Sequence, residues 1–503
     1  MNQDFNRRSF LKLAGLTAAA LGVPGSLYAE KAWEPAWNSL IQHTTPSWFQ
    51  DAKFGIYFHW GVISVPAFGY EWYSRNMYIE GTACNKFHNL VYGPPSKFGY
   101  KDFIPRFYAE KFNPEEWAEL FRKSGAKFAG PVAEHCDGFS MWDSQVNKWN
   151  AARMGPRRDV VGELSRAIRN EGLTFITTFH HQWLWGWYPT MNKSFDCSNP
   201  KYQGLYGPPA PGSPFVYGES PTKTPPPPQT FQDNFVAKTR EVIYKYHPSL
   251  LYFDSRLNII DERHLTSLFS YYYNQAERWQ EEVSITYKNS DVPSGVGILD
   301  IERGSLAELT PYNWLTDDAL GWKSWSYIQN PDYKSAGWIV TELVDIVSKN
   351  GSLLLDIPPA ADGVIPEPVV GRLLAIGKWL GVNGEAIYGT RPWKIYGEGP
   401  TRVKGGNFGD EKALNFVAQD IRFTTRWKTL YATALGWPKD SNELTIKSLG
   451  TSANLLAKGE IANISLLGSD AKLTWRQNAD GLRIALPPES PGDFAYVFRV
   501  WLN

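Results

Sequence analysis

Cysteine is scarce in this sequence. Its only three cysteines are Cys84, Cys136 and Cys197 in a chain of 503 residues, far apart and odd in number. Their spacing matches neither a disulfide framework nor the paired cysteines of a zinc-binding motif, so at most one disulfide could form. The hydrophobic content of 43% is enough for a sizeable core.

The sequence also lacks an excess of charge of either sign. It has 51 basic and 51 acidic residues, so the formal net charge is zero. A neutral chain has no overall field that attracts polyanions, which argues against a nucleic acid as a partner. A length of 503 residues exceeds one ordinary domain and predicts two.

Long hydrophobic runs are absent, apart from a short one near the N-terminus. Arg7 and Arg8 precede an apolar run at residues 13–23, which is too short to span a bilayer comfortably. Paired arginines before such a run are typical of a twin-arginine export signal, here residues 1–29, with cleavage near Ala29. The alternative is a basic tail on a buried helix. The signal predicts a periplasmic or secreted protein without stable membrane insertion after cleavage.

Aromatic residues, in contrast, are abundant. They make up 15% of the chain and include 22 tryptophans. Aromatic faces stack on the apolar faces of sugars, which favours a carbohydrate ligand. The alternative is that the rings fill a large core.

Strand and helix patterns alternate over residues 30–392. Strands are expected at 54–61, 126–133, 173–179, 250–253, 283–287 and 352–359. Helices are expected at 114–124, 159–171, 231–246, 339–349 and 367–380, the first capped by Asn113. A Pro-rich segment at 207–229 is interpreted as a surface excursion. Repeated units with acidic residues and histidines at strand ends predict a (β/α)8-like TIM barrel.

The pattern changes after residue 392. Short alternating or β-branched segments at 421–427, 444–446 and 482–486 are separated by turn residues. Residues 393–503 are therefore predicted to form a C-terminal antiparallel β-sandwich.

Acidic residues at the predicted strand ends are candidates for glycoside hydrolysis, which needs two carboxyl groups across the scissile bond. Asp254 ends the apolar run at 250–253 and is the nucleophile candidate; the alternative is a turn or helix-capping aspartate. Glu302 follows a later strand candidate and is the acid/base candidate. Spacing does not decide among these two and the competing carboxylates Asp137, Asp300 and Asp356.

Other polar and aromatic residues at strand ends suit a sugar ring. His59 follows the first strand and could bind a sugar hydroxyl, or could be a core histidine. Glu71 and Trp72 place a carboxylate beside an aromatic ring on a loop, and Tyr252 flanks Asp254.

The barrel region resembles the α-L-fucosidase family, glycoside hydrolase family 29. The resemblance covers about residues 48–393 and is carried by segments 48–61, 71–73, 135–142, 345–355 and 384–390. It implies a catalytic barrel followed by a β-sandwich, and a retaining exo-glycosidase. It also assigns roles to residues: Asp254 is the implied nucleophile, Glu302 the acid/base, and His59, Glu71, Trp72 and His135 contact the sugar.

The sequence departs from the family motif at several positions. Cys136 stands where the family has a second histidine, and cysteine is a poorer hydrogen-bond partner for a hydroxyl. Ser255 replaces the glycine after the nucleophile, and Phe179 lies near the position of a family tyrosine, followed by His180. The substrate-binding set therefore includes Phe179, His180 and Tyr252. The departures indicate a divergent subgroup with an altered glycone or an unusual fucoside.

The sequence thus predicts release of terminal α-L-fucose from fucosylated oligosaccharides or polysaccharides, without metal or organic cofactor. Alternatives are hydrolysis of a related α-L-glycoside such as an α-L-galactoside, a non-catalytic carbohydrate-binding barrel, and a structural envelope protein. The oligomeric state is left open, and the β-sandwich is expected to brace the barrel.

Overall fold

The computed structural model describes residues 32–210, 225–409, 415–439 and 441–503. Residues 33–503 form one compact unit. The predicted signal at 1–29 and residues 211–224 of the Pro-rich excursion lie outside the described residues, so these interpretations stay predictions. Within the described residues, every helix is too short or too polar to cross a membrane.

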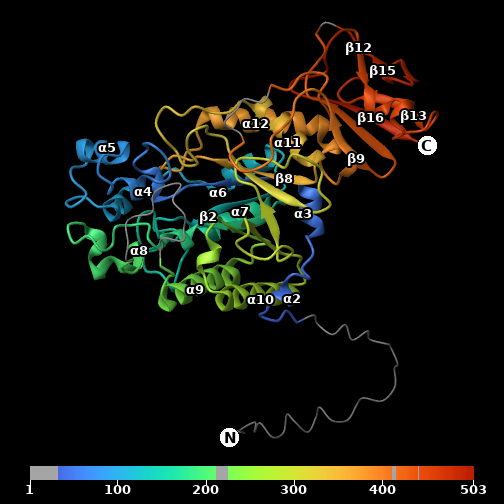
Figure 1. Cartoon of the computed structure of the whole chain (residues 1–503). Coiled ribbons are helices and arrows are strands. Elements are labelled where there is room, and N and C mark those ends of the chain that lie inside the picture. Colours follow the sequence, from blue (N-terminus) through green and yellow to red (C-terminus); the bar gives the residue numbers. More distant parts are fainter. Residues whose placement is uncertain (1–31, 211–224, 410–414, 440) are drawn as a thin grey trace, which may run out of the picture. The chain divides into compact units, whose positions relative to one another are not determined.

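A closed barrel of eight parallel strands forms the first part of this unit (Figure 1). Each strand pairs with its neighbour in chain order, and β1 closes the ring by pairing with β8. The predicted TIM barrel is confirmed. The strands are β1 (Phe54–Phe58), β2 (Phe128–Glu134), β3 (Thr174–Phe179), β4 (Leu250–Phe253), β5 (Ser284–Lys288), β6 (Ile298–Asp300), β7 (Trp314–Ala319) and β8 (Gly351–Ile357).

Helices cover most of the barrel wall. Their starts follow from local sequence: Asn113 accepts hydrogen bonds from the backbone N–H groups of Glu115 and Glu116, and Pro114 occupies the first turn. No helix lies between β5 and β6 or between β6 and β7, since the described residues 289–297 and 301–313 are loops. The covering helices are α6 (Pro114–Lys123), α7 (Val160–Asn170), α9 (Gln229–Tyr246), α10 (Glu262–Trp279), α11 (Ala336–Ser348) and α12 (Glu367–Asn383).

Short helices occupy the N-terminal segment and the loops. They are α2 (Trp37–Leu40), α3 (Ser47–Ala52), α4 (Tyr73–Asn76), α5 (Ala83–Val91) and α8 (Gln203–Tyr206). α2 precedes the barrel and packs against α10. α4 and α5 belong to the long loop after β1, which carries Glu71 and Trp72.

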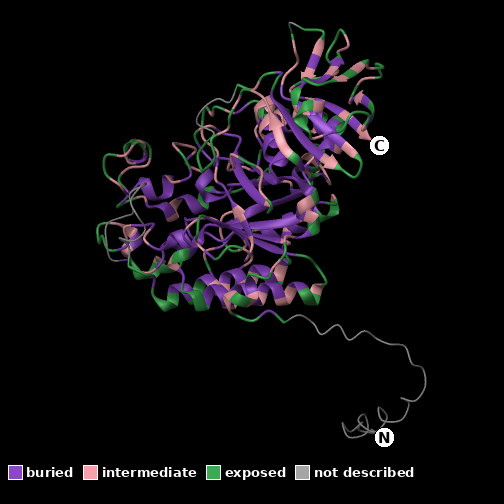
Figure 2. Ribbon diagram, turned by 45° about the vertical axis from the view of Figure 1, so that its right-hand side comes forward, coloured by how far each residue is buried: buried purple, intermediate pink, exposed green. Residues whose placement is uncertain are grey.

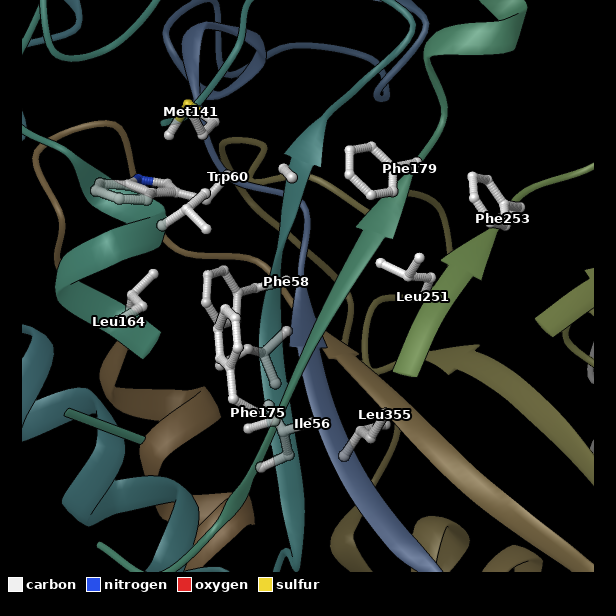
Figure 3. Close-up of a cluster of buried hydrophobic side chains, with 14 of the residues drawn as sticks. Ile56, Phe58, Trp60, Met141, Leu164, Phe175, Phe179, Leu251, Phe253 and Leu355 are labelled. Carbon is white, nitrogen blue, oxygen red and sulfur yellow. The ribbon is translucent and has the colours of Figure 1, made fainter. Parts of the chain in front are cut away.

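The barrel strands are buried on both faces (Figure 2). Side chains that point to the barrel axis, such as Ile176 and Leu354, form an inner cluster. Side chains of the opposite parity, such as Phe175 and Leu251, pack in the layer between strands and helices (Figure 3). Burial on both faces explains why these strands are continuous apolar runs in the sequence.

Two antiparallel sheets follow the barrel. One has the strand order β13-β16-β11-β10-β9 and the other β12-β15-β14. Apolar residues of both sheets share one core, so the sheets form the predicted sandwich. The boundary between residues 392 and 393 stays a prediction. The strands are β9 (Arg391–Glu398), β10 (Ile421–Arg426), β11 (Thr429–Ala434), β12 (Glu443–Ile446), β13 (Ile461–Leu466), β14 (Trp475–Asn478), β15 (Gly481–Ala485) and β16 (Tyr496–Leu502).

Strand β7 of the barrel and the long covering helix α10 were not expected from the sequence. β7 contains Thr316, Asp317 and Asp318, which are all buried, so the strand lacks the apolar pattern of its neighbours. The polar residues of β7 have partners that come from distant parts of the chain, such as Lys334 for Asp318 and Tyr57 for Asp317.

Candidate active site

A cavity of ≈ 310 Å³ lies at the carboxyl ends of the barrel strands. This is near the lower end of the range for small-ligand sites, about 300–1,000 Å³. Its lining comes from strand ends and from loops far apart in the sequence: Tyr57, His59, Glu71, Trp72, His135, Cys136, His180, Trp183, Asp254, Ser255, Lys288, Asn289, Glu302, Asp317, Trp325, Asn407 and Phe408.

Asp254 lies directly after β4 and points into the cavity. Its backbone N–H donates to the carbonyl oxygen of Phe179 at the end of β3 (3.1 Å). The amide of Gln182 donates to the carbonyl oxygens of Asp254 and Ser255 (2.7 and 2.9 Å). The backbone around this carboxylate is therefore fixed on both sides, as a positioned reactive group requires.

Glu302 lies two residues after β6, on a loop that continues along β7. Ile301 and Arg303 on either side donate backbone hydrogen bonds to Leu315 and Asp317 (2.9 and 2.8 Å). The Glu302 side chain keeps 21% exposure, so it borders the cavity and can exchange protons with its contents.

Lys288 at the end of β5 lies between the two carboxylates. Its Nζ is 3.2 Å from Oδ1 of Asp254 and 2.8 Å from Oε2 of Glu302. These two oxygens are therefore at most about 6.0 Å apart. Lys288 also lies 3.7 Å from Asp300 and 3.4 Å from Asp317. One buried ammonium group thus faces four carboxyl groups.

This arrangement separates the proton affinities of the two cavity carboxyls. Burial alone would raise the pKa of Asp254, but Lys288 and a hydrogen bond from His180 outweigh burial and hold it well below its usual value. Burial raises the pKa of Glu302 to about 7, with Asp254 adding to the rise and Lys288 opposing it. The charge of Lys288 is retained despite burial, because Asp317, Glu302 and Asp254 raise its pKa. At neutral pH one carboxyl is ionised and the other can hold a proton.

A polar layer supports the cavity from inside the barrel. The hydroxyl groups of Tyr57 and Tyr252 donate to Oδ2 of Asp317 (2.9 and 2.8 Å). Tyr252 also donates to Asp300 (3.2 Å), and Asp300 accepts from the backbone N–H of Asp317 (3.0 Å). These bonds hold the buried carboxyls of Asp300 and Asp317 that flank Lys288 in fixed positions.

Three histidines form one side of the cavity. Nδ1 of His59 is 2.8 Å from Oδ1 of Asp356, and the same oxygen accepts from the His59 backbone N–H. Oδ1 is therefore an acceptor, which assigns the proton to Nδ1 of His59 and leaves Nε2 as an acceptor. Nδ1 of His180 lies 3.3 Å from Asp254. Burial lowers the pKa values of His59 and His135, so both are neutral near pH 7.

Two fully buried nitrogen atoms of this histidine group have no hydrogen-bond partner among the described residues: Nδ1 of His135 and Nε2 of His180. Buried polar atoms that are unsatisfied in the protein are suited to ligand hydroxyls. One nitrogen from each of His59, His135 and His180 also lies within 4.8 Å of the others, an arrangement that could hold a divalent transition metal. The same donors fit a polyhydroxylated ring.

Glu71 and Trp72 reach the cavity from the long loop after β1. Oε2 of Glu71 accepts from the backbone N–H of Trp325 (3.1 Å), and burial raises the pKa of Glu71. Trp72 packs edge-on against Trp183, which also lines the cavity. Cys136 lines the cavity as a thiol 3.9 Å from Nε2 of His135. It places a weak hydrogen-bonding group where an imidazole was expected.

Two of the predicted substrate-binding residues do not line the cavity. Phe179 is fully buried and stacks on Phe253 in the layer between strands and helices (Figure 3). Tyr252 is fully buried inside the barrel, one layer below Asp254. Strand alternation explains the position of Phe179, because His180 points inward and its neighbour Phe179 therefore points outward. Tyr252 points inward like Asp254, but it lies deeper in the barrel, where its hydroxyl bonds to Asp317.

The competing carboxylates lie outside the cavity lining. Asp137 accepts from the Tyr100 hydroxyl (2.5 Å) and the Phe139 backbone. Asp300 belongs to the polar layer, and Asp356 orients His59. Of these candidate catalytic acids, Asp254 and Glu302 are the two that line the cavity, and Lys288 lies between them.

Several cavity residues were missed from the sequence. Lys288 directly follows the strand predicted at 283–287 and is the last residue of β5, so a charged residue after an apolar and β-branched run is a usable signal. Asp317 belongs to the unexpected strand β7. Asn407 and Phe408 come from a loop beyond the barrel, and nothing in their local sequence relates them to this cavity.

Comparison with known proteins gives consistent matches. The family profile described as alpha-L-fucosidase matches residues 24–385, and that described as alpha-L-fucosidase C-terminal domain matches residues 415–501. The tissue alpha-L-fucosidase of Rattus norvegicus is 31% identical over 95% of this chain and 94% of its own. The tissue alpha-L-fucosidase of Homo sapiens is 31% identical over 93% of this chain and 92% of its own.

A solved structure is similar over the same length. The crystal structure of Thermotoga maritima alpha-fucosidase in complex with fucose has a TM-score of 0.71 and 28% sequence identity. The match covers 93% of this chain and 100% of that chain. The similarity therefore includes both the barrel and the C-terminal sheets.

Proposed function

Because the chain belongs to the α-L-fucosidase family of glycoside hydrolases, we propose that it releases terminal α-L-fucose with retention of configuration, Asp254 being the nucleophile and Glu302 the acid/base. The observation that carries this proposal is the pair of carboxyls around Lys288, with oxygens at most about 6.0 Å apart. Retaining enzymes place their two carboxyls about 5–5.5 Å apart, and inverting enzymes about 6.5–9.5 Å.

In the first step, an oxygen of ionised Asp254 attacks C1 of the fucosyl unit. The bond between C1 and the glycosidic oxygen breaks, its electron pair passes to that oxygen, and Glu302 donates a proton to it. The different proton affinities of the two groups support these roles, since the pKa of Asp254 is low and that of Glu302 is raised to about 7.

In the second step, Glu302 is a carboxylate and takes a proton from water. The water oxygen attacks C1, the ester bond to Asp254 breaks, and its electron pair returns to the carboxylate. Two inversions at C1 give net retention. Glu302 is again protonated and the site is ready for another turnover.

The remaining cavity residues are proposed to hold the sugar. His59 and His135 offer neutral imidazole nitrogens to the hydroxyl groups, His180 offers its unsatisfied Nε2, and Trp72 offers an apolar face. A volume of ≈ 310 Å³ suits a single sugar ring, which supports removal of a terminal unit from a fucosylated glycan.

The test is hydrolysis of an aryl α-L-fucoside by the wild type, Asp254→Ala and Asp261→Ala, with proton NMR of the first sugar released. We expect α-fucose from the wild type, a loss of at least about 10³-fold in kcat for Asp254→Ala, and near wild-type turnover for Asp261→Ala. Asp261 is a half-exposed carboxylate that follows the same strand and serves as the matched control.

Early release of β-fucose would contradict retention. Unchanged turnover by Asp254→Ala would contradict the assigned nucleophile. Absence of turnover by the wild type on every α-L-fucoside would contradict the activity itself.

A further inference from the structure

A short segment from beyond the barrel, residues 405–409, pairs with the loop that carries Glu302. The backbone N–H groups of Phe408 and Gly409 donate to the carbonyl oxygens of Glu302 and Arg303, both at 2.8 Å. Gly406 donates to Ser305 (2.9 Å), and these two residues form an antiparallel bridge. Residues 405–409 thus hold the loop after β6 by backbone hydrogen bonds, as a neighbouring strand would.

The same segment holds both backbone polar groups of Glu302. The Glu302 N–H donates to Oδ1 of Asn407 (3.0 Å), and the Glu302 carbonyl accepts from Phe408. The amide of Asn407 also donates to Oδ1 of Asn289 (3.4 Å), which lines the cavity next to Lys288. The position of the proposed acid/base therefore depends on residues about a hundred positions later in the chain.

Backbone conformation shows that this contact is close and constrained. A Cβ at Gly304 would lie 2.0 Å from the carbonyl oxygen of Gly406, so only glycine allows the approach. Phe408 has a φ of 55°, in the left-handed region that bulky residues rarely adopt. Such strain persists only where the surrounding structure holds it, and it is concentrated at functional sites.

Phe408 is the residue that this constraint presents to the cavity. Its side chain lines the cavity beside Asn407 and keeps 41% exposure. It belongs to none of the hydrophobic clusters of the barrel or the sandwich. The backbone of Phe408 is held in place by its hydrogen bond to Glu302. An exposed aromatic residue fixed next to the proton donor is suited to contact the group that leaves with that proton.

We propose that residues 405–409 form the leaving-group side of the active site, with Phe408 as a stacking platform for the pyranose ring to which fucose is attached. This rests on the proposed function, since the leaving group is the one that Glu302 protonates. Asn289 lines both the catalytic cavity and a neighbouring cavity of ≈ 860 Å³. Further sugar units of a glycan therefore have space beside this platform.

The test compares two substrates that share the fucosyl unit and differ in the leaving group. α-L-Fucosyl fluoride has no ring to stack and needs little protonation. The second substrate is whichever α-1,2-, α-1,3-, α-1,4- or α-1,6-linked fucosyl disaccharide the wild type cleaves fastest. Phe408→Ala should lower kcat/KM on the disaccharide about tenfold and leave the fluoride within about twofold.

Three further variants make the test specific. Phe408→Tyr keeps an aromatic ring and should retain activity on the disaccharide, whereas Phe408→Leu keeps apolar bulk without a flat face and should lose it like Phe408→Ala. Trp427→Ala removes an aromatic side chain that is 92% exposed in the same C-terminal region and lies outside the cavity lining. It should leave both substrates unaffected.

Equal losses on both substrates in Phe408→Ala and Phe408→Leu would overturn the platform and give Phe408 a purely structural role. Unchanged disaccharide hydrolysis in both variants would overturn it as well. Failure of the wild type to hydrolyse the fluoride would instead overturn the proposed function, so the two failures are distinguishable.

Discussion

Lys288 decides the chemistry at the residue scale. It is buried, and its ammonium group lies within 3.7 Å of Asp254, Asp300, Glu302 and Asp317. Its positive charge favours the ionised form of each acid. The low pKa of Asp254 depends on this charge, and the pKa of Glu302 would lie above about 7 without it.

Replacing Lys288 by methionine should therefore move the pH profile of kcat/KM to higher pH. In the wild type, activity requires ionised Asp254 and protonated Glu302, so it should fall as the pH rises through about 7. Loss of the ammonium raises both pKa values, which shifts the acidic and the basic limb upward. The measurement is kcat/KM on an aryl α-L-fucoside between pH 3 and 10, a range of ~7 units that covers the basic limb and any acidic limb that the methionine variant brings above the start of the range.

Lys288→Arg is the matched control, because it keeps the charge and should leave both limbs near their wild-type positions. A methionine variant with an unchanged acidic limb would show that Lys288 does not set the ionisation of Asp254. The thermal midpoint of each variant separates this effect from unfolding.

At the scale of elements, the packing between neighbouring strands and helices decides which glycines can be replaced. Gly130 in β2 lies against β3, where a Cβ would be 1.7 Å from the carbonyl oxygen of Ile176. Gly371 in α12 is exposed, and a Cβ there would have nothing within 4 Å. The two positions therefore differ in how much space an added methyl group would find and in the element that carries it.

Alanine at these positions should change stability in opposite directions. Gly130→Ala should lower the free energy of unfolding by about 3 kcal/mol or more, because the clash is with backbone that cannot move without opening the barrel. Gly371→Ala should raise it by about 0.5–1 kcal/mol, since alanine favours a helix interior. Urea denaturation followed by circular dichroism measures both; destabilisation by Gly371→Ala would contradict the packing argument.

At the scale of the whole molecule, a buried ion pair connects the barrel to the C-terminal sheets. Asp345 in α11 accepts from Arg422 of β10 (2.6 Å) and from Lys349 (2.7 Å). The indole N–H of Trp379 in α12 donates to the carbonyl oxygen of Ala495 (2.8 Å). Residues 33–503 accordingly behave as one compact unit.

Arg422→Met should lower the stability of the whole unit by about 1.5–3 kcal/mol, the contribution of a charged hydrogen bond. We expect a single calorimetric transition at a lower temperature, because barrel and sheets share this contact. A split into two transitions, one at the wild-type temperature, would show instead that the two parts unfold independently. Arg426→Met, near an exposed turn of the same sheet, is the control.

The sequence by itself determined the barrel and the position of its nucleophile candidate. Strands buried on both faces are apolar runs, and helices begin with capping residues such as Asn113. The alternation of strands and helices along the chain is therefore visible in the sequence. A carboxylate directly after such a run, as Asp254 is, has to lie at the carboxyl rim of the barrel. The family motifs then gave His59 and Glu302 their expected roles.

Only the tertiary structure decided which side chains meet. Strand parity turned Phe179 away from the cavity, and barrel closure brought Lys288 between Asp254 and Glu302. Phe408 reaches the cavity through backbone hydrogen bonds to a loop about a hundred residues earlier. Contacts of this kind depend on the closed path of the chain, and a local sequence pattern carries no information about its distant partner.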